Sequence, residues 1–255
     1  MDNVARYPLL VFVISFFVLW LSVKIGAFFR RRRPKLEEEI SADLGVIQAA
    51  ALTLLGLIIG FSFSMAVGRY DQRKNYEEAE ANAIGTEYLR ADLLPAADAA
   101  KVRALLRDYL DQRVLFYVTR DGQKIRQINA RTAQLQAELW SVVLAPAGAQ
   151  PTPLVALAVS GMNDVLNSQG YTQAAWWNRI PVPAWFLMLA MGICCNVLVG
   201  YSARNVKAEG ILLLVLPLVV SVSFFLISDI DSPRGGFILV KPQNLISLVD
   251  SVRPH

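Results

Sequence analysis

Side chains that could bind or steer an ion crowd into one short stretch of this sequence. Residues 69–80, "RYDQRKNYEEAE", place arginines, a lysine and carboxylates within about three helical turns. A ring of charge at the mouth of a passage selects ions by sign, and arginines near a membrane surface concentrate anions. The alternative is a solvated helix face with ion pairs four residues apart. The residues that we consider for a charged mouth are Arg69, Asp71, Arg73 and Glu78.

A second pair of carboxylates follows the last apolar run of the chain. Asp229 and Asp231 lie in "SDIDSPRGG" and could contribute oxygen ligands to a hard cation. Two ligands are weak evidence for a metal, so we expect no metal site. The sequence favours a turn at residues 233–236, followed by a short strand or a docking segment.

Enzyme chemistry has little support in this sequence. The single histidine is His255, the last residue, so no histidine base or histidine-ligated metal is placed within a fold. No phosphate-binding loop, dinucleotide-binding glycine motif or zinc-protease motif is present. We therefore expect neither catalysis nor a cofactor.

Small residues repeat every fourth position in the second apolar segment. This ladder begins as "GLIIG", a G-x-x-x-G motif, and consists of Gly56, Gly60, Ser64 and Gly68. Helices in lipid associate through close backbone approach, which small residues permit. The ladder therefore predicts helix packing, either within one subunit or between subunits and beside a pore.

A neighbouring face of the same segment carries a second four-residue repeat, Thr53, Leu57 and Phe61. If several copies of this helix surround an axis, the repeat would line an apolar constriction of the kind that gates by dewetting. The alternative is that these side chains face lipid or the protein core.

Composition indicates which elements must position these residues. The chain has 255 residues, 55% of them hydrophobic, which is typical of a membrane protein. The net charge of +4 owes much to four consecutive arginines directly after an apolar segment. Such a run flanks membranes, so we expect lipid and not nucleic acid as a partner.

Four apolar segments approach or exceed the roughly 20 residues that a helix needs to cross a bilayer. They lie at about residues 9–29, 44–67, 183–201 and 211–228. The sequence thus predicts a transmembrane hairpin (1–68), a helical extramembrane domain (69–179), a second hairpin (180–230) and a tail (231–255).

Orientation follows from the short loops "RRRRPK" and "SARNVK", because short loops rich in Lys and Arg stay in the cytoplasm. Alternation then places the helical domain and both termini on the other side of a bacterial inner membrane.

The region between the hairpins shows helical periodicity. The second span has no strong breaker before Pro95, so its helix should continue well beyond the apolar part. A three–four spacing of apolar residues from Ile125 to Val142 predicts a bundle seam, which could also bind a partner protein. We expect an all-α fold.

Several of these motifs resemble those of the bacterial bestrophin-like domain family, membrane proteins of unassigned function. The residues that carry the resemblance are Gly60-Phe61, Arg69-Tyr70-Asp71, Arg73, Glu78-Ala79, Asn82-Ala83, Asp231 and Gly236. A fainter resemblance links "IGFSFSMAVGRYD" to the neck helix of true bestrophins, which are pentameric anion channels.

The resemblance implies that Thr53, Leu57 and Phe61 occupy the neck positions of a pore. It suggests a homo-oligomer, a pentamer by analogy, that conducts small ions, anions in particular, or regulates their passage. The alternative is a non-conducting membrane sensor or scaffold that binds a protein partner through its helical domain.

Overall fold

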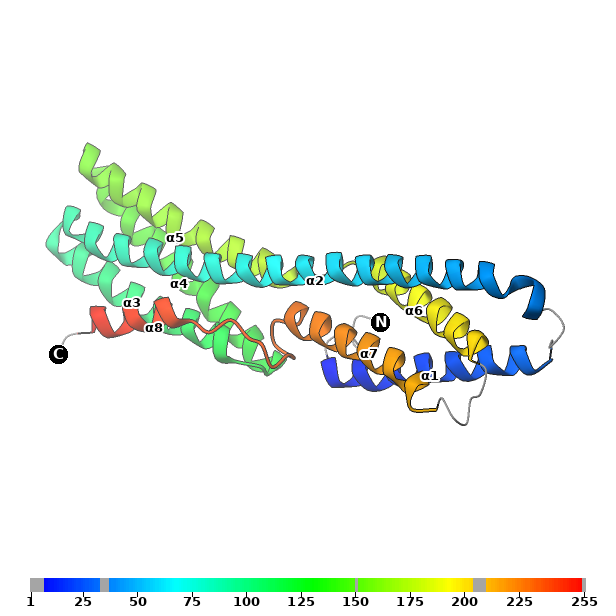
Figure 1. Cartoon of the computed structure of the whole chain (residues 1–255). Coiled ribbons are helices and arrows are strands. Elements are labelled where there is room, and N and C mark those ends of the chain that lie inside the picture. Colours follow the sequence, from blue (N-terminus) through cyan, green and yellow to red (C-terminus); the bar gives the residue numbers. More distant parts are fainter. Residues whose placement is uncertain (1–6, 33–36, 150, 204–209, 254–255) are drawn as a thin grey trace. The chain divides into compact units, whose positions relative to one another are not determined.

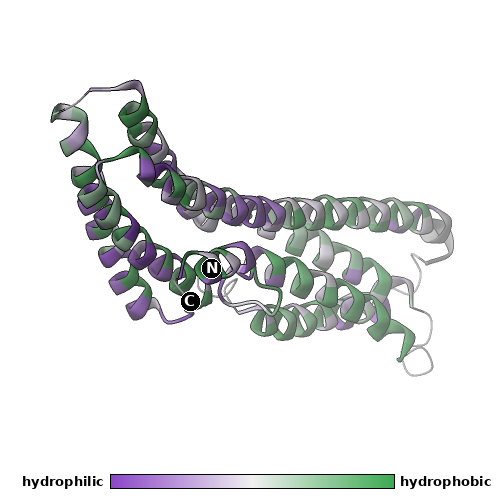
Figure 2. Cartoon of the chain, turned by 90° about the vertical axis from the view of Figure 1, so that its left-hand side faces the viewer, coloured by the Kyte–Doolittle hydropathy of each residue, from purple (hydrophilic) through white to green (hydrophobic). Residues whose placement is uncertain are grey.

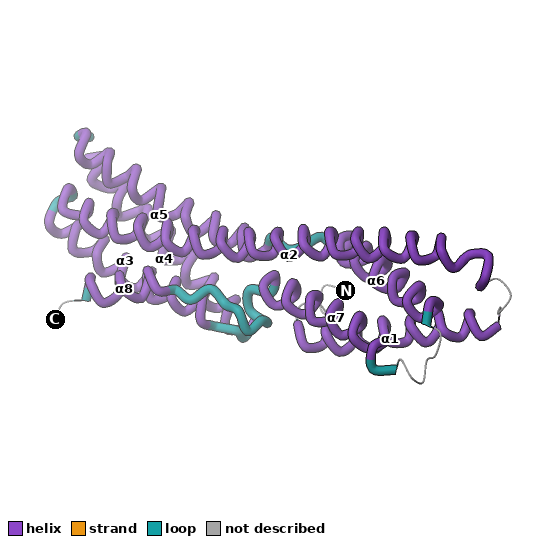
Figure 3. Tube along the Cα trace, viewed as in Figure 1, coloured by secondary structure: helices purple, strands orange, loops and turns teal. Residues whose placement is uncertain are grey.

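All elements that the structure describes are helices (Figures 1 and 3). The computed structural model describes residues 7–32, 37–149, 151–203 and 210–253. The elements are α1 (Pro8–Arg32), α2 (Glu37–Arg90), a 3-10 turn (Ala91–Leu93), α3 (Ala96–Val118), α4 (Gly122–Ala149), α5 (Pro153–Trp177), α6 (Val182–Ser202), α7 (Leu212–Asp231) and α8 (Gln243–Val252). The all-α prediction is confirmed.

Four of the described helical stretches are long and apolar enough to cross a membrane. They are α1, α2, the stretch Pro153–Ser202 that contains α6, and α7. These are the four spans predicted from the sequence. The arginine-rich loop after α1 and the loop after α6, on which the predicted orientation depends, lie partly outside the described residues.

The chain divides into two compact units. The first comprises Met1–Arg69 and Arg179–Leu239, and the second comprises Tyr70–Asn178 and Val240–His255. α2 contributes to both, because this 54-residue helix runs without interruption to Arg90. Its predicted continuation beyond the apolar part is confirmed, and Figure 2 shows its change from apolar to polar composition along its length.

In the first unit, α1 packs against both α6 and α7. α1 and α6 approach so closely that a Cβ added to Gly26 would overlap the carbonyl oxygen of Val197. Likewise, a Cβ on Gly200 would overlap the carbonyl oxygen of Val23. Glycines thus let the two backbones touch, which is how helices commonly associate in lipid.

The second unit is a helical bundle in which α3 packs against α4 and α8, and α4 against α5. Its core contains Leu106 and Phe116 of α3, Leu135 and Leu139 of α4, and Met162 of α5. The seam predicted on α4 faces this core, since its members from Ile128 to Val142 are buried and Ile125 packs against the core.

The end of the chain forms a helix where the sequence suggested a short strand or a docking segment. After a turn at residues 233–235 and bends at 236–238, Val240 and Leu245 join the core of the second unit. Docking is therefore confirmed. The strand alternative is wrong, because α8 buries Leu245 and packs Leu248, Val249 and Val252 at three- and four-residue intervals, which suits a helix.

Candidate functional site

One face of α2 in the first unit is left uncovered by the rest of that unit. The side chains of Leu57 and Phe61 are 53% and 65% exposed, and Thr53 is exposed with its hydroxyl donating to Ala49 of its own helix. The opposite face packs inward through Leu55 and Ala66, both almost fully buried. The residues predicted for a pore neck therefore all lie on the outward face.

The small-residue ladder lies on the same outward side. A Cβ added to Gly56, Gly60 or Gly68 would meet no described atom within 4 Å, and Ser64 is exposed. Packing within the subunit, one of the two alternatives from the sequence, is therefore absent at these glycines among the described residues. The glycines that pack within the subunit are instead Gly26 and Gly200.

Burial differs sharply between the four membrane-spanning candidates. Within its most apolar window, α2 has 6% of its residues buried, whereas α7 has 50%. A helix this apolar and this exposed must contact lipid, neighbouring subunits or both.

At the end of α7, a buried carboxylate joins three segments of the first unit. The Oδ1 atom of Asp231 lies 3.5 Å from the Nη1 atom of Arg69. The backbone N–H of Ile180 donates to both oxygens of Asp231, at 3.2 and 3.1 Å. One side chain thus ties together α2, the segment before α6 and the end of α7.

The neighbouring carboxylate, Asp229, organises the turn that follows α7. It accepts backbone hydrogen bonds from Phe237 at 2.7 Å and from Ile238 at 2.8 Å. The turn brings Gly236 against the end of α7 so closely that a Cβ there would overlap the carbonyl oxygen of Asp229, so glycine is required.

These hydrogen bonds and the ion pair argue against a cation site at the two aspartates. Both carboxylates of Asp229 and Asp231 are directed at N–H donors and a guanidinium, which compete with a metal for the same oxygens. No group of three or more potential metal-ligating side chains occurs in the described part of the chain.

The charged stretch of α2 divides between the two sides of the helix. Asp71 and Glu78 are exposed, whereas Arg73 is only 1% exposed and its Nε donates to the carbonyl oxygen of Ala175 at 3.4 Å. With Arg69 paired to Asp231, neither arginine proposed for the charged mouth lies on an open surface.

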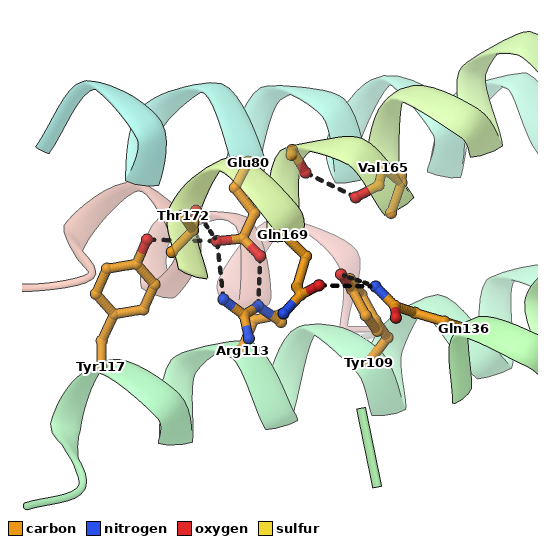
Figure 4. Close-up of polar contacts among 9 residues, drawn as sticks. Glu80, Tyr109, Arg113, Tyr117, Gln136, Val165, Gln169 and Thr172 are labelled. Atoms are coloured by element: carbon orange, nitrogen blue, oxygen red, sulfur yellow. Dashed lines mark hydrogen bonds and ion pairs between the residues drawn. The ribbon is translucent and has the colours of Figure 1, made fainter. Parts of the chain in front are cut away.

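A buried charge pair links α2 to α3 inside the second unit (Figure 4). Arg113 and Glu80 have no exposed side-chain surface, and the guanidinium donates to both carboxylate oxygens. Glu80 also accepts hydrogen bonds from the hydroxyls of Tyr117, at 3.3 Å, and Thr172, at 3.2 Å. Such pairs are tolerated in a core only when their remaining hydrogen-bonding capacity is used, as it is for this carboxylate.

Two further features support this network. Burial and the nearby Glu80 carboxylate raise the pKa of Tyr117 well above its usual value, so its hydroxyl remains a donor. At the other end of the group drawn in Figure 4, the amide of Gln136 donates to Tyr109 and to Gln169, each at 3.4 Å.

α8 is attached to α2 through another buried carboxylate, Glu77. It accepts from the side-chain amide of Asn244 at 2.7 Å and from the backbone N–H of Leu245 at 3.0 Å. A carboxylate at the first turn of a helix satisfies N–H groups that have no partner within that helix.

The sequence contains a signal for these buried groups that our interpretation did not use. Charged residues at positions 73, 77, 80 and 87 follow the three–four spacing usually shown by core residues. All four are buried in the second unit.

The family model described as Bestrophin-like domain matches residues 15–245. The chain belongs to this family. A comparison with curated proteins gives no match.

Solved structures share the bestrophin-like fold over nearly the whole chain. A single-residue variant of a bacterial Bestrophin homolog from Klebsiella pneumoniae superposes with a TM-score of 0.62 at 12% identity, covering 94% of this chain and 93% of that one. The same homolog, solved by Zn-SAD phasing, gives a TM-score of 0.60 at 14% identity and covers 92% and 94%. At such identities the likeness concerns the fold alone.

Proposed function

We propose that this bestrophin-like membrane protein assembles into a homo-oligomer in which copies of α2 surround a passage for small ions. In this arrangement Thr53, Leu57 and Phe61 face the passage, and the ladder from Gly56 to Gly68 lets neighbouring helices approach closely. A pentamer is the assembly that the resemblance to true bestrophins suggests.

The observation that carries the proposal is the outward face of α2. A Cβ added to its glycines would meet no described atom within 4 Å, although other glycines of the same unit are in tight contact between α1 and α6. Exposed small residues in an apolar helix suit contact with a second copy of that helix. The apolar stripe beside them suits a constriction that water leaves easily.

Selectivity for anions is supported by the family resemblance alone. The two arginines that could attract anions are not available for it, since Arg69 is paired with Asp231 and Arg73 is buried. The exposed charges on the following turns are Asp71, Lys74 and Glu78, which are of mixed sign. The ion must therefore be identified with anions and cations measured in parallel.

Ion flux through purified protein in liposomes tests the proposal, with chloride and potassium gradients measured separately. Wild-type protein should carry one of these ions above the rate of empty liposomes, and Phe61→Ala should change that rate several-fold by widening the constriction. Phe17→Ala is the matched control, because Phe17 is an exposed phenylalanine on α1. No flux of either ion, with Phe61→Ala also silent, would exclude conduction.

The alternative, a scaffold that binds a partner through the α4 seam, lacks an observation in its favour. The seam residues Leu135 and Leu139 are fully buried in the core of their own unit. A partner could reach them only if that core opened.

A further inference from the structure

Glu87, near the end of α2, is a buried carboxyl group without a hydrogen-bond partner in the described part of the chain. Its side chain has no exposed surface, and neither Oε1 nor Oε2 has a hydrogen-bond partner within the described residues. The other two buried glutamates of this helix differ, since Glu77 and Glu80 each accept several hydrogen bonds. An ionised carboxylate in such a place would lack both water and hydrogen bonds from the described residues, which is strongly unfavourable.

The surface opposite Glu87 belongs to α5. A Cβ added to Gly161 would overlap Oε2 of Glu87 and would also lie 2.5 Å from Nη1 of Arg90. Glycine at this position therefore makes room for the carboxyl group between α2 and α5. Gly161 is itself buried.

Charged groups on α2 and α5 act on the ionisation of Glu87 in opposite directions. Arg90 on α2 stabilises the ionised form and Asp164 on α5 opposes it, but burial is the largest influence and raises the pKa of Glu87 to about 8. On α3, Arg103 is engaged elsewhere, because it pairs with Asp92 at 2.5 Å and donates to the carbonyl oxygen of Tyr88.

We propose that Glu87 acts as a proton-operated latch between α2 and α5. With a proton bound, the neutral carboxyl packs against Gly161 and holds the two helices together. When the proton is lost, the carboxylate becomes charged where neither oxygen accepts a hydrogen bond from the described residues, and the contact opens so that water can reach it. The latch is a property of the second unit and does not depend on whether the protein conducts ions.

The direction of the pH response follows from linkage. The packed state holds its proton up to a pKa of about 8, whereas a solvated glutamate has the ordinary value of 4.5. The packed state therefore binds more protons, and its advantage is complete below pH 4.5 and declines as pH rises. Between these two values the opening equilibrium should grow about tenfold for each pH unit, and above pH 8 it should level off.

Amide hydrogen exchange on the full chain in detergent micelles measures this opening directly. Exchange would be followed in peptides of α5 around Gly161 at pH 5.5, 6.5 and 7.5, after correction for the intrinsic dependence of exchange on pH. In wild-type protein the corrected protection should fall by roughly tenfold per pH unit. Constant protection across this range would overturn the proposal without any variant.

Two substitutions assign the response to Glu87. Glu87→Gln keeps the shape without the titration, and Glu87→Met provides a second neutral side chain should the first fold poorly. Both should show protection in α5 that does not change with pH. Glu138→Gln is the matched control at an exposed glutamate, 49% exposed on α4, and should retain the wild-type slope. A slope that persists in both Glu87 variants would assign the titration to another group and refute the latch.

Discussion

Arg69 and Asp231, 162 positions apart in the sequence, form an ion pair of 3.5 Å between α2 and the end of α7. Their side chains are only 14% and 6% exposed. Both belong to the motifs by which the sequence resembles bestrophin-like proteins. The pair therefore links α2 to α7 at the position where α2 ceases to be apolar, and we assign these residues to architecture and not to ion attraction.

Asp231→Asn should destabilise the protein by roughly 1–3 kcal/mol. This lies between the loss expected when an exposed ion pair is broken and the loss expected when a buried one is broken. Asparagine can still accept from Ile180 but leaves the Arg69 charge without its partner. Thermal unfolding in detergent would show the loss as a lower midpoint. Asp92→Asn is the control, because Asp92 is 67% exposed in its pair with Arg103 and should cost less than about 1 kcal/mol.

Gly236→Ala should destabilise the first unit by about 1–3 kcal/mol, because the new methyl group would overlap the backbone carbonyl of Asp229. The backbone cannot yield without weakening the Asp229 bonds to Phe237 and Ile238. Gly170→Ala on α5 meets no described atom within 4 Å and should be neutral or slightly stabilising through helix propensity. Equal unfolding midpoints for the two variants would contradict this assignment.

Much of the helical architecture could be predicted from the sequence, because its signals are local. Apolar length defines the four spans, and the lack of a breaker before Pro95 predicts the long α2. The ladder of glycines was also visible. Whether these glycines pack inside the subunit was not, because the sequence does not show which helix lies opposite; Gly26 and Gly200 perform that role instead.

The buried charges were harder to predict because charge normally indicates exposure. Arg73 was proposed for a charged mouth, with a solvated helix face as the alternative, and Glu87 was passed over, although their spacing matched the inward face of α2. Partners such as Arg113, 33 positions from Glu80, are set by tertiary packing and leave no local trace. The same holds for α8, whose ten residues gain their stability from docking and not from length.

Glu80→Gln should destabilise the second unit by about 3–5 kcal/mol, because it leaves the buried Arg113 guanidinium without a counter-charge. Replacing both residues, as Glu80→Leu with Arg113→Met, should cost clearly less than that single change, since no charge is then buried. Chemical unfolding monitored by the fluorescence of the buried Trp176 would compare them. A double variant less stable than Glu80→Gln would argue that the pair itself is the source of stability.

The proposed assembly makes opposite predictions for two glycines of the first unit. Gly60→Leu adds a side chain where no described atom lies within 4 Å, so the subunit should keep its helix content and unfolding midpoint. If α2 helices touch one another at this face, however, the bulk should force them apart, and native mass spectrometry should detect smaller species than in the wild type. Gly200→Leu should instead disrupt the α1–α6 contact, where the new atoms would overlap Val23, and lower the unfolding midpoint whatever the oligomeric state. An unchanged assembly in a correctly folded Gly60→Leu protein would mean that this face of α2 meets lipid, and the α2-lined passage would then have to be abandoned.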